Sequence, residues 1–156
     1  MPKINPFLWF DHQAEEAAAF YVSVFPNSRI VEVVRYGEAG PGPAGSVMTV
    51  AFDLDGQRFN GLNGGPIFTF SEAISFHVDC RDQAEVDHYW EKLSAGGQTS
   101  QCGWLKDRYG VSWQVVPQTL LRLLRDPDPV KSQRVMAAML KMTKIDVATL
   151  EAAAAG

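Results

Sequence analysis

Residues 104–117 read WLKDRYGVSWQVVP, and this stretch decides the fold. Asp107 and Gly110 are typical of the two ends of a tight turn, and the segment after Gly110 is rich in β-branched and aromatic residues. Pro117 lacks a backbone N–H, so it ends the second strand. The stretch therefore predicts a β-hairpin with its turn at residues 107–110.

The second strand of this hairpin has two distinct faces, because successive side chains of a strand point to opposite sides of the sheet. Gln114 shares its face with two smaller residues, Ser112 and Val116. Its amide is therefore placed to face a cavity. The opposite face carries Val111, Trp113 and Val115.

Outward from the hairpin, the chain predicts two similar halves, each with a strand, a helix and further strands. In the first half, Asp11 or His12 is the expected helix cap, and the strands fall at residues 4–10, 29–36, 47–54 and 58–62. In the second half, Asp82 and Glu85 resemble a capping box. Its strands fall at residues 74–80, 98–105 and 111–116.

Two local repeats favour duplication of a βαβββ unit. Gln13-Ala14-Glu15 and Gln83-Ala84-Glu85 both begin predicted helices. A glycine also precedes a carboxamide by four residues in both halves, at Gly56 to Asn60 and at Gly110 to Gln114. Because both repeats come at matching points, they indicate an internal duplication. The predicted fold class is α+β, with paired βαβββ units forming a curved mixed sheet around a cleft.

The composition after Pro117 changes to helix formers, which predicts helices at residues 118–125, 130–142 and 147–155. A methionine-rich face on the second of these is expected to pack against the sheet or a partner chain, because methionine fills irregular gaps. The predicted division is a first unit, a linker, a second unit and a helical C-terminal extension, at residues 1–64, 65–73, 74–117 and 118–156.

The hairpin, together with three other segments, resembles the vicinal oxygen chelate superfamily, which includes glyoxalase I, bleomycin-resistance proteins and extradiol dioxygenases. The other segments are Ile4–Phe10, Glu15–Tyr21 and Ile74–Asp79. The resemblance is strongest to the PhnB-like branch, whose members are often labelled 3-demethylubiquinone-9 3-methyltransferase-like. It implies a substrate cleft between the two units and a homodimer.

Metal-using members of this superfamily hold a divalent cation with His and Glu or Gln side chains from the first and last strands of each unit. The resemblance places the first-strand positions at Pro6 (or Asn5) and Ala73, and the last-strand positions at Asn60 and Gln114. Proline and alanine cannot ligate, and two neutral amides leave a dication undercompensated. A cleft without metal or cofactor is therefore expected. The chain also lacks the Gly-rich loop that cradles an adenosyl cofactor in α/β methyltransferases.

His77 is the candidate catalytic residue, because strand alternation puts it on the same face as Ser75, where it is placed to look into the cleft. A solvated or hydrogen-bonded sheet histidine is the alternative. Cys102 is a candidate nucleophile, against a structural thiol. The expected ligand is a small apolar or aromatic molecule. Its predicted binding residues are Asn60, Ser75, His77, Trp104 and Gln114, and the aromatic candidates beside the cleft are Phe10, Phe59, Phe68, Phe70 and Trp104.

Three interpretations of the function are compatible with the sequence. The first is a binding protein of the bleomycin-resistance type, which needs only aromatic walls and amides. The second is an enzyme with His77 and Gln114 as its proton shuttle. The third is one of the alternatives that the resemblance implies, either a metal-dependent lyase, isomerase or dioxygenase whose ligands include His77, or a methyltransferase-like enzyme as the branch label suggests.

Composition restricts the partners and the compartment. The formal net charge is -4 with acidic and basic residues interspersed, so no basic stripe is available for nucleic acid. No stretch approaches the ~18 apolar residues that cross a bilayer. We therefore expect a soluble cytoplasmic protein without nucleic-acid or membrane partners, in which Cys80 and Cys102 are thiols.

Overall fold

The computed structural model describes residues 2–156, which fall into two units that divide between Phe70 and Ser71. In the first unit the strands lie in the order β1-β4-β3-β2. β1 runs parallel to β4, and the other neighbours are antiparallel. The elements are β1 (Phe7–Phe10), α1 (Ala14–Val24), β2 (Arg29–Arg35), β3 (Val47–Leu54) and β4 (Gln57–Asn63).

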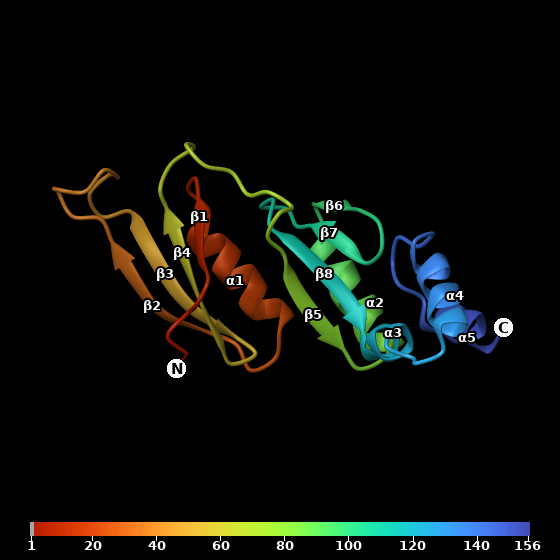
Figure 1. The fold of residues 1–156 in the computed structure, drawn as a ribbon. Helices are drawn as coiled ribbons and strands as arrows, with labels where there is room; N and C mark the ends of the chain where they lie inside the picture. Colours follow the sequence, from red (N-terminus) through yellow and green to blue (C-terminus); the bar gives the residue numbers. More distant parts are fainter. Residues whose placement is uncertain (1) are drawn as a thin grey trace. The chain divides into compact units, whose positions relative to one another are not determined.

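Helix α1 covers one face of the first sheet (Figure 1). Its buried stripe includes Ala17 and Tyr21, and the Tyr21 ring stacks on Phe52 of β3 with 6.2 Å between ring centroids. Small alanines let the helix approach the strands closely, and the aromatic pair fills the space beyond them. This packing leaves the opposite face of the sheet free of helices from the first unit.

The predicted N-cap of α1 is wrong. Asp11 and His12 are exposed, and the N-cap residue is Gln13, whose side chain makes no capping hydrogen bond. The backbone N–H of Ala14 instead donates to Asn63 Oδ1 at 2.8 Å. Because Asn63 lies 49 residues away at the end of β4, the helix start is satisfied by tertiary structure.

The second unit repeats this arrangement, with the strand order β5-β8-β7-β6 and a parallel pair formed by β5 and β8. Asp82 caps α2 by accepting from the Glu85 N–H at 3.0 Å, as predicted. Helix α2 buries Val86, Tyr89 and Leu93. The elements are β5 (Phe76–Cys80), α2 (Gln83–Ser94), β6 (Gln98–Thr99), β7 (Trp104–Lys106) and β8 (Ser112–Pro117).

The prediction of one strand over residues 98–105 is wrong. A turn at residues 100–103 separates β6 from β7, and Cys102 has φ +58°. The N–H groups of Cys102 and Gly103 donate to the carbonyls of Met142 and Thr143 at 2.9 and 2.8 Å. These bonds to the C-terminal region take the place of the ladder bonds that a continuous strand requires.

Three C-terminal helices within the described residues extend the second unit: α3 (Gln118–Leu124), α4 (Pro129–Met139) and α5 (Val147–Ala155). Asp128 and Asp146 cap α4 and α5. A buried cluster joins the helices to Val116 of β8, and Met139 and Met142 pack against that cluster. The methionine-rich face therefore contributes to packing within the chain.

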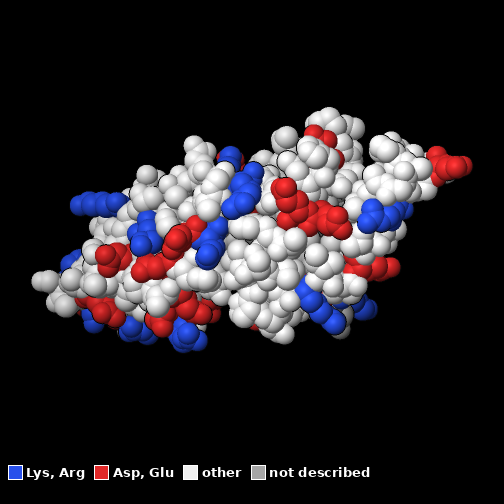
Figure 2. All heavy atoms as spheres, turned by 180° about the vertical axis from the view of Figure 1, so that it is seen from behind, with Lys and Arg blue, Asp and Glu red and all other residues white. Residues whose placement is uncertain are grey.

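The α+β class, the paired βαβββ units and the helical extension are confirmed. In the part of the chain that the structure describes, each helix is too short or too polar to cross a bilayer. Lys and Arg side chains are interspersed with Asp and Glu on the face drawn in Figure 2.

Candidate functional site

In each unit, a carboxamide on the last strand is hydrogen-bonded to a polar side chain that lies just before the first strand. In the first unit Asn60 Nδ2 donates to Asn5 Oδ1 at 2.6 Å. In the second unit Gln114 Nε2 donates to Ser75 Oγ at 2.8 Å. All four residues are half-buried.

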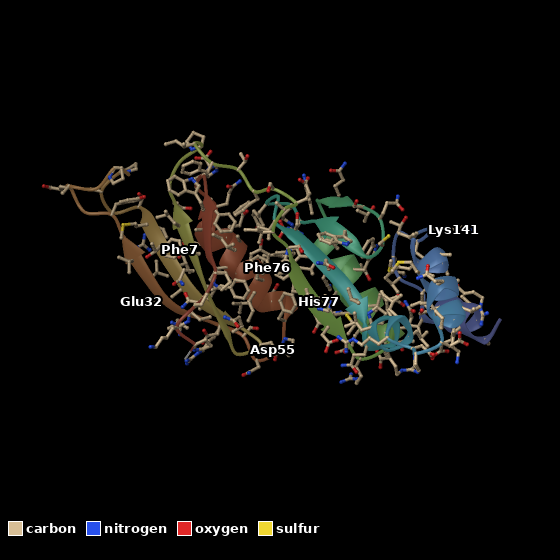
Figure 3. The ribbon with its side chains drawn as sticks, in the orientation of Figure 1. Phe7, Glu32, Asp55, Phe76, His77 and Lys141 are labelled. Carbon is tan, nitrogen blue, oxygen red and sulfur yellow. The ribbon has the colours of Figure 1, made fainter. Side chains whose placement is uncertain are left out.

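The two pairs occupy equivalent positions, as the strand register shows. Asn60 lies opposite Phe7 in the β1–β4 pair, and Gln114 lies opposite His77 in the β5–β8 pair. Asn5 lies two residues before Phe7, and Ser75 lies two residues before His77, so each shares a face with that residue. Figure 3 labels Phe7 on β1 and His77 on β5, the two equivalent strands.

This register corrects the first-strand positions inferred from the sequence. The side chain beside Asn60 is that of Asn5, the alternative to Pro6. Pro6 contributes only its backbone carbonyl, which accepts from the Asn60 N–H at 2.9 Å. The side chain beside Gln114 is Ser75 and not Ala73. The sequence alone does not reveal this, because a strand read in isolation carries no register with its partner.

His77, Gln114 and Trp104 form one row across three strands. Gln114 of β8 is the register partner of both His77 on β5 and Trp104 on β7. Register partners share a face, so these three predicted site residues lie side by side. His77 is exposed, and no ion pair to an acidic side chain orients its imidazole in the described part of the chain.

Packing accounts for most of the candidate aromatic residues. Phe10 and Phe59 are buried; Phe59 stacks on Phe52 of the neighbouring strand, and Phe10 meets the edge of Phe70. Phe68 is exposed and makes an edge contact with Trp9. Trp104, which is half-buried, is the aromatic candidate that lines a pocket of the second unit.

This pocket has a volume of about 490 Å³ and lies beside β6 and β7. Trp104, Lys106 and Ser112 line it from the hairpin, and Glu72 lines it from the segment before β5. Lys106 Nζ forms an ion pair with Glu72, and the bond to the ammonium holds the pKa of that carboxyl below its usual range. The binding residues predicted from the sequence do not include Lys106, Ser112 or Glu72, although strand alternation places Ser112 on the face of Gln114.

The polar pairs do not fit a divalent metal ion. They offer two carboxamides in one unit, and a carboxamide and a hydroxyl in the other, all of them neutral. Hard and borderline dications are held mainly by carboxylates, imidazoles or thiolates. Within residues 2–156, no group of three or more His, Cys, Asp or Glu side chains is arranged to hold a metal ion.

The two cysteines differ sharply in environment. Cys80 is fully buried on β5, and burial, with a smaller contribution from Glu85, raises the pKa of its thiol from 9.0 to about 12. Cys102 is half-buried, lines the pocket, and directs Sγ toward the Met139 carbonyl at 3.6 Å. Cys80 is therefore a structural thiol.

Alkylation of the native protein at pH 8 is expected to modify Cys102 at least about tenfold faster than Cys80, because the thiolate is the reactive form. Peptide mass spectrometry measures both rates, and equal rates would contradict the assignment of Cys80 as a structural thiol.

The raised pKa of Cys80 also links folding to proton binding. The free energy of unfolding should fall from about pH 9 to about pH 12, where the unfolded thiol ionises and the folded one does not. Cys80→Ala should remove that part of the slope.

Comparison with known proteins identifies relatives that share this fold. A PhnB protein from Bacillus cereus, provisionally described as a 3-demethylubiquinone-9 3-methyltransferase, is 40% identical with a TM-score of 0.69, covering 74% of this chain and 99% of its own. Protein PA1353 from Pseudomonas aeruginosa is 20% identical with a TM-score of 0.63, covering 75% and 98%. No curated protein matches the chain significantly.

A more distant structure shows the superfamily fold alone. The fosfomycin resistance protein FosX from Listeria monocytogenes, in complex with Mn(II) and sulfate, is 14% identical with a TM-score of 0.50 and covers 72% of this chain and 88% of its own. The profile of the 3-demethylubiquinone-9 3-methyltransferase family matches residues 2–116. The chain therefore belongs to that family, within the PhnB-like branch of the vicinal oxygen chelate superfamily.

Proposed function

We propose that this protein binds a small, apolar or aromatic molecule without using a metal ion. The residues proposed to contact it are Asn60, Ser75, His77, Trp104 and Gln114. The observation that carries the proposal is the pair of hydrogen bonds, Asn60 to Asn5 and Gln114 to Ser75, at equivalent positions of the two units. Neutral amides beside aromatic surface suit an organic ligand with a few polar atoms.

Catalysis is a further step, for which His77 with Gln114 is the candidate proton shuttle. Their positions as register partners bring the two side chains onto one face. If a turnover is found, His77→Ala decides the matter, because unchanged turnover would end the role of His77 as a shuttle. The homodimer and the cleft shared by the two units stay predictions, and light scattering tests the first.

Two measurements test the binding proposal. Elemental analysis of the purified protein is expected to find well below one divalent ion per chain, whereas a stoichiometric ion would favour the metal-dependent alternative. Thermal unfolding with neutral aromatic probes, benzyl alcohol and 2-naphthol, is expected to show a rise in Tm. S-adenosylmethionine serves as the comparison, and a rise with this compound alone would favour the methyltransferase of the family name.

A pair of variants locates the binding. Gln114→Ala should reduce the rise in Tm with 2-naphthol, because it removes the amide at the centre of the proposed site. Gln133→Ala changes an exposed glutamine on α4 and should leave the rise unchanged. Equal behaviour of the two variants would exclude Gln114 from the site.

A further inference from the structure

The hydroxyl of Ser112 is a buried donor without a partner. Ser112 is 3% exposed, and its Oγ makes no hydrogen bond to any described residue. Leaving a buried hydroxyl unpaired opposes folding, so native proteins rarely retain one without a use. Ser112 also lines the pocket beside β6 and β7, so its hydroxyl is placed to meet a molecule that enters there.

A lysine is the neighbour of Ser112 on the adjacent strand. Lys106 of β7 is the register partner of Ser112 on β8, so the two side chains leave the sheet on the same face as neighbours. Both line the pocket. An ammonium and a hydroxyl side by side form a donor pair that suits an anionic oxygen.

Glu72 shows that a carboxylate pairs with the Lys106 half of this donor pair. Its carboxylate is paired with Lys106 Nζ, but its side chain is 63% exposed and extends from a segment that precedes β5. An exposed ion pair contributes little to stability, so another carboxylate can replace it at small cost. The Glu72 carboxylate thus marks one position beside Lys106 Nζ at which a carboxylate is bound.

The remaining wall of the pocket favours a ring. Trp104 lines the same pocket two residues before Lys106, on the same face of β7. Its register partner is Gln114, which belongs to the proposed binding row. A volume of about 490 Å³ is ample for one substituted aromatic ring.

We infer that this pocket binds an aromatic carboxylate, whose carboxylate displaces Glu72 to accept from Lys106 Nζ and Ser112 Oγ while its ring lies against Trp104. The inference rests on the proposed small-molecule function and adds the chemical class of the ligand. It also adds three residues, Lys106, Ser112 and Glu72, to the site. No covalent step is involved.

The test compares benzoate with benzyl alcohol, its neutral counterpart, and with acetate, which lacks the ring. Titrations of the ¹⁵N-labelled protein follow the indole N–H signal of Trp104, assigned through Trp104→Phe. Benzoate is expected to bind at least about tenfold more tightly than either comparison compound, as befits a charge-assisted hydrogen bond. Equal affinities for benzoate and benzyl alcohol would overturn the inference and leave the proposed function standing. Failure of benzoate to shift the Trp104 signal would overturn it too.

Variants of Lys106 and Glu72 test the role of each side chain in benzoate binding. Lys106→Met should abolish the preference for benzoate, whereas Lys131→Met should not. Lys131 is a matched control because it is paired with Asp126 and is 40% exposed, against 37% for Lys106. Glu72→Gln should raise benzoate affinity, because it removes the competing carboxylate. A benzoate preference that survives Lys106→Met, or one that Glu72→Gln weakens, would contradict the binding mode.

Ser112→Ala separates a binding role from a structural one. The variant removes an unpaired buried hydroxyl, so Tm should stay the same or rise while benzoate affinity falls about tenfold. Unchanged benzoate affinity would mean that the hydroxyl does not contact the ligand, and would remove Ser112 from the site. A fall in Tm would show that Ser112 supports the fold, and would equally count against the inference.

Discussion

Asp107→Ala is expected to lower the free energy of unfolding by about 4 kcal/mol, because it leaves a set of buried donors without an acceptor. Asp107 is 3% exposed. Its Oδ1 accepts from the N–H groups of Tyr109 and Val111 at 2.8 and 3.1 Å, and its Oδ2 accepts from the Trp113 indole at 2.9 Å. One carboxylate thus fixes the turn and anchors it to the second strand.

Urea unfolding followed by circular dichroism measures the loss. Glu38→Ala is the control, because Glu38 is exposed in a turn and its change should fall within about 0.5 kcal/mol. A loss below about 1 kcal/mol for Asp107→Ala would show that water replaces the carboxylate, and would contradict the argument.

A double-mutant cycle isolates the indole bond. Asp107→Asn keeps an acceptor for the backbone but turns an N–H group toward the indole donor of Trp113. Trp113→Phe removes that donor, so Asp107→Asn should cost less in the Trp113→Phe background. Additive losses would mean that the 2.9 Å contact contributes no coupling.

Gly97→Ala is expected to cost about 3 kcal/mol, because the new methyl group has no room. A Cβ at position 97 would lie 2.2 Å from the Lys106 carbonyl oxygen and 2.7 Å from the Asp107 carbonyl carbon. Both are backbone atoms, so no side chain can rotate away, and the hairpin itself must move. The same displacement should shift the amide signals of residues 106 and 107.

Gly37→Ala is the control for this variant. A Cβ at position 37 would have no neighbour within 4 Å, and its backbone is outside the left-handed region. That variant should be neutral or slightly stabilising, since alanine restricts the unfolded chain. Urea unfolding measures both variants. Equal unfolding midpoints would show that the hairpin backbone moves to accommodate the new methyl group at little cost.

The candidate site was only partly accessible to sequence reasoning. Alternation along residues 112–117 placed Gln114 on its face, and the carboxamide repeat of Asn60 and Gln114 indicated equivalent strands, which the register confirms. The register between the first and last strands of each unit decides that Asn5 and Ser75 are the hydrogen-bond partners. Two strands 39 or 55 residues apart carry no local signal for that offset.

The residues that line the pocket could not be predicted from the sequence for a related reason. Lys106 and Ser112 belong to the hairpin itself, but the pocket between them and Glu72 depends on where the segment before β5 runs. A lysine in a strand is ordinarily read as a solvated edge residue. Only the structure shows that Ser112 is buried without a partner.

The sequence by itself determined the α+β class, the paired units, the hairpin and the helix cap Asp82, since each follows from contacts within a few residues. Tertiary structure alone decided three features. These are the capping of α1 by Asn63, the break between β6 and β7, and the pairing of Gln114 with Ser75. Each one joins segments distant in sequence, and such contacts exist only after both segments have packed into place.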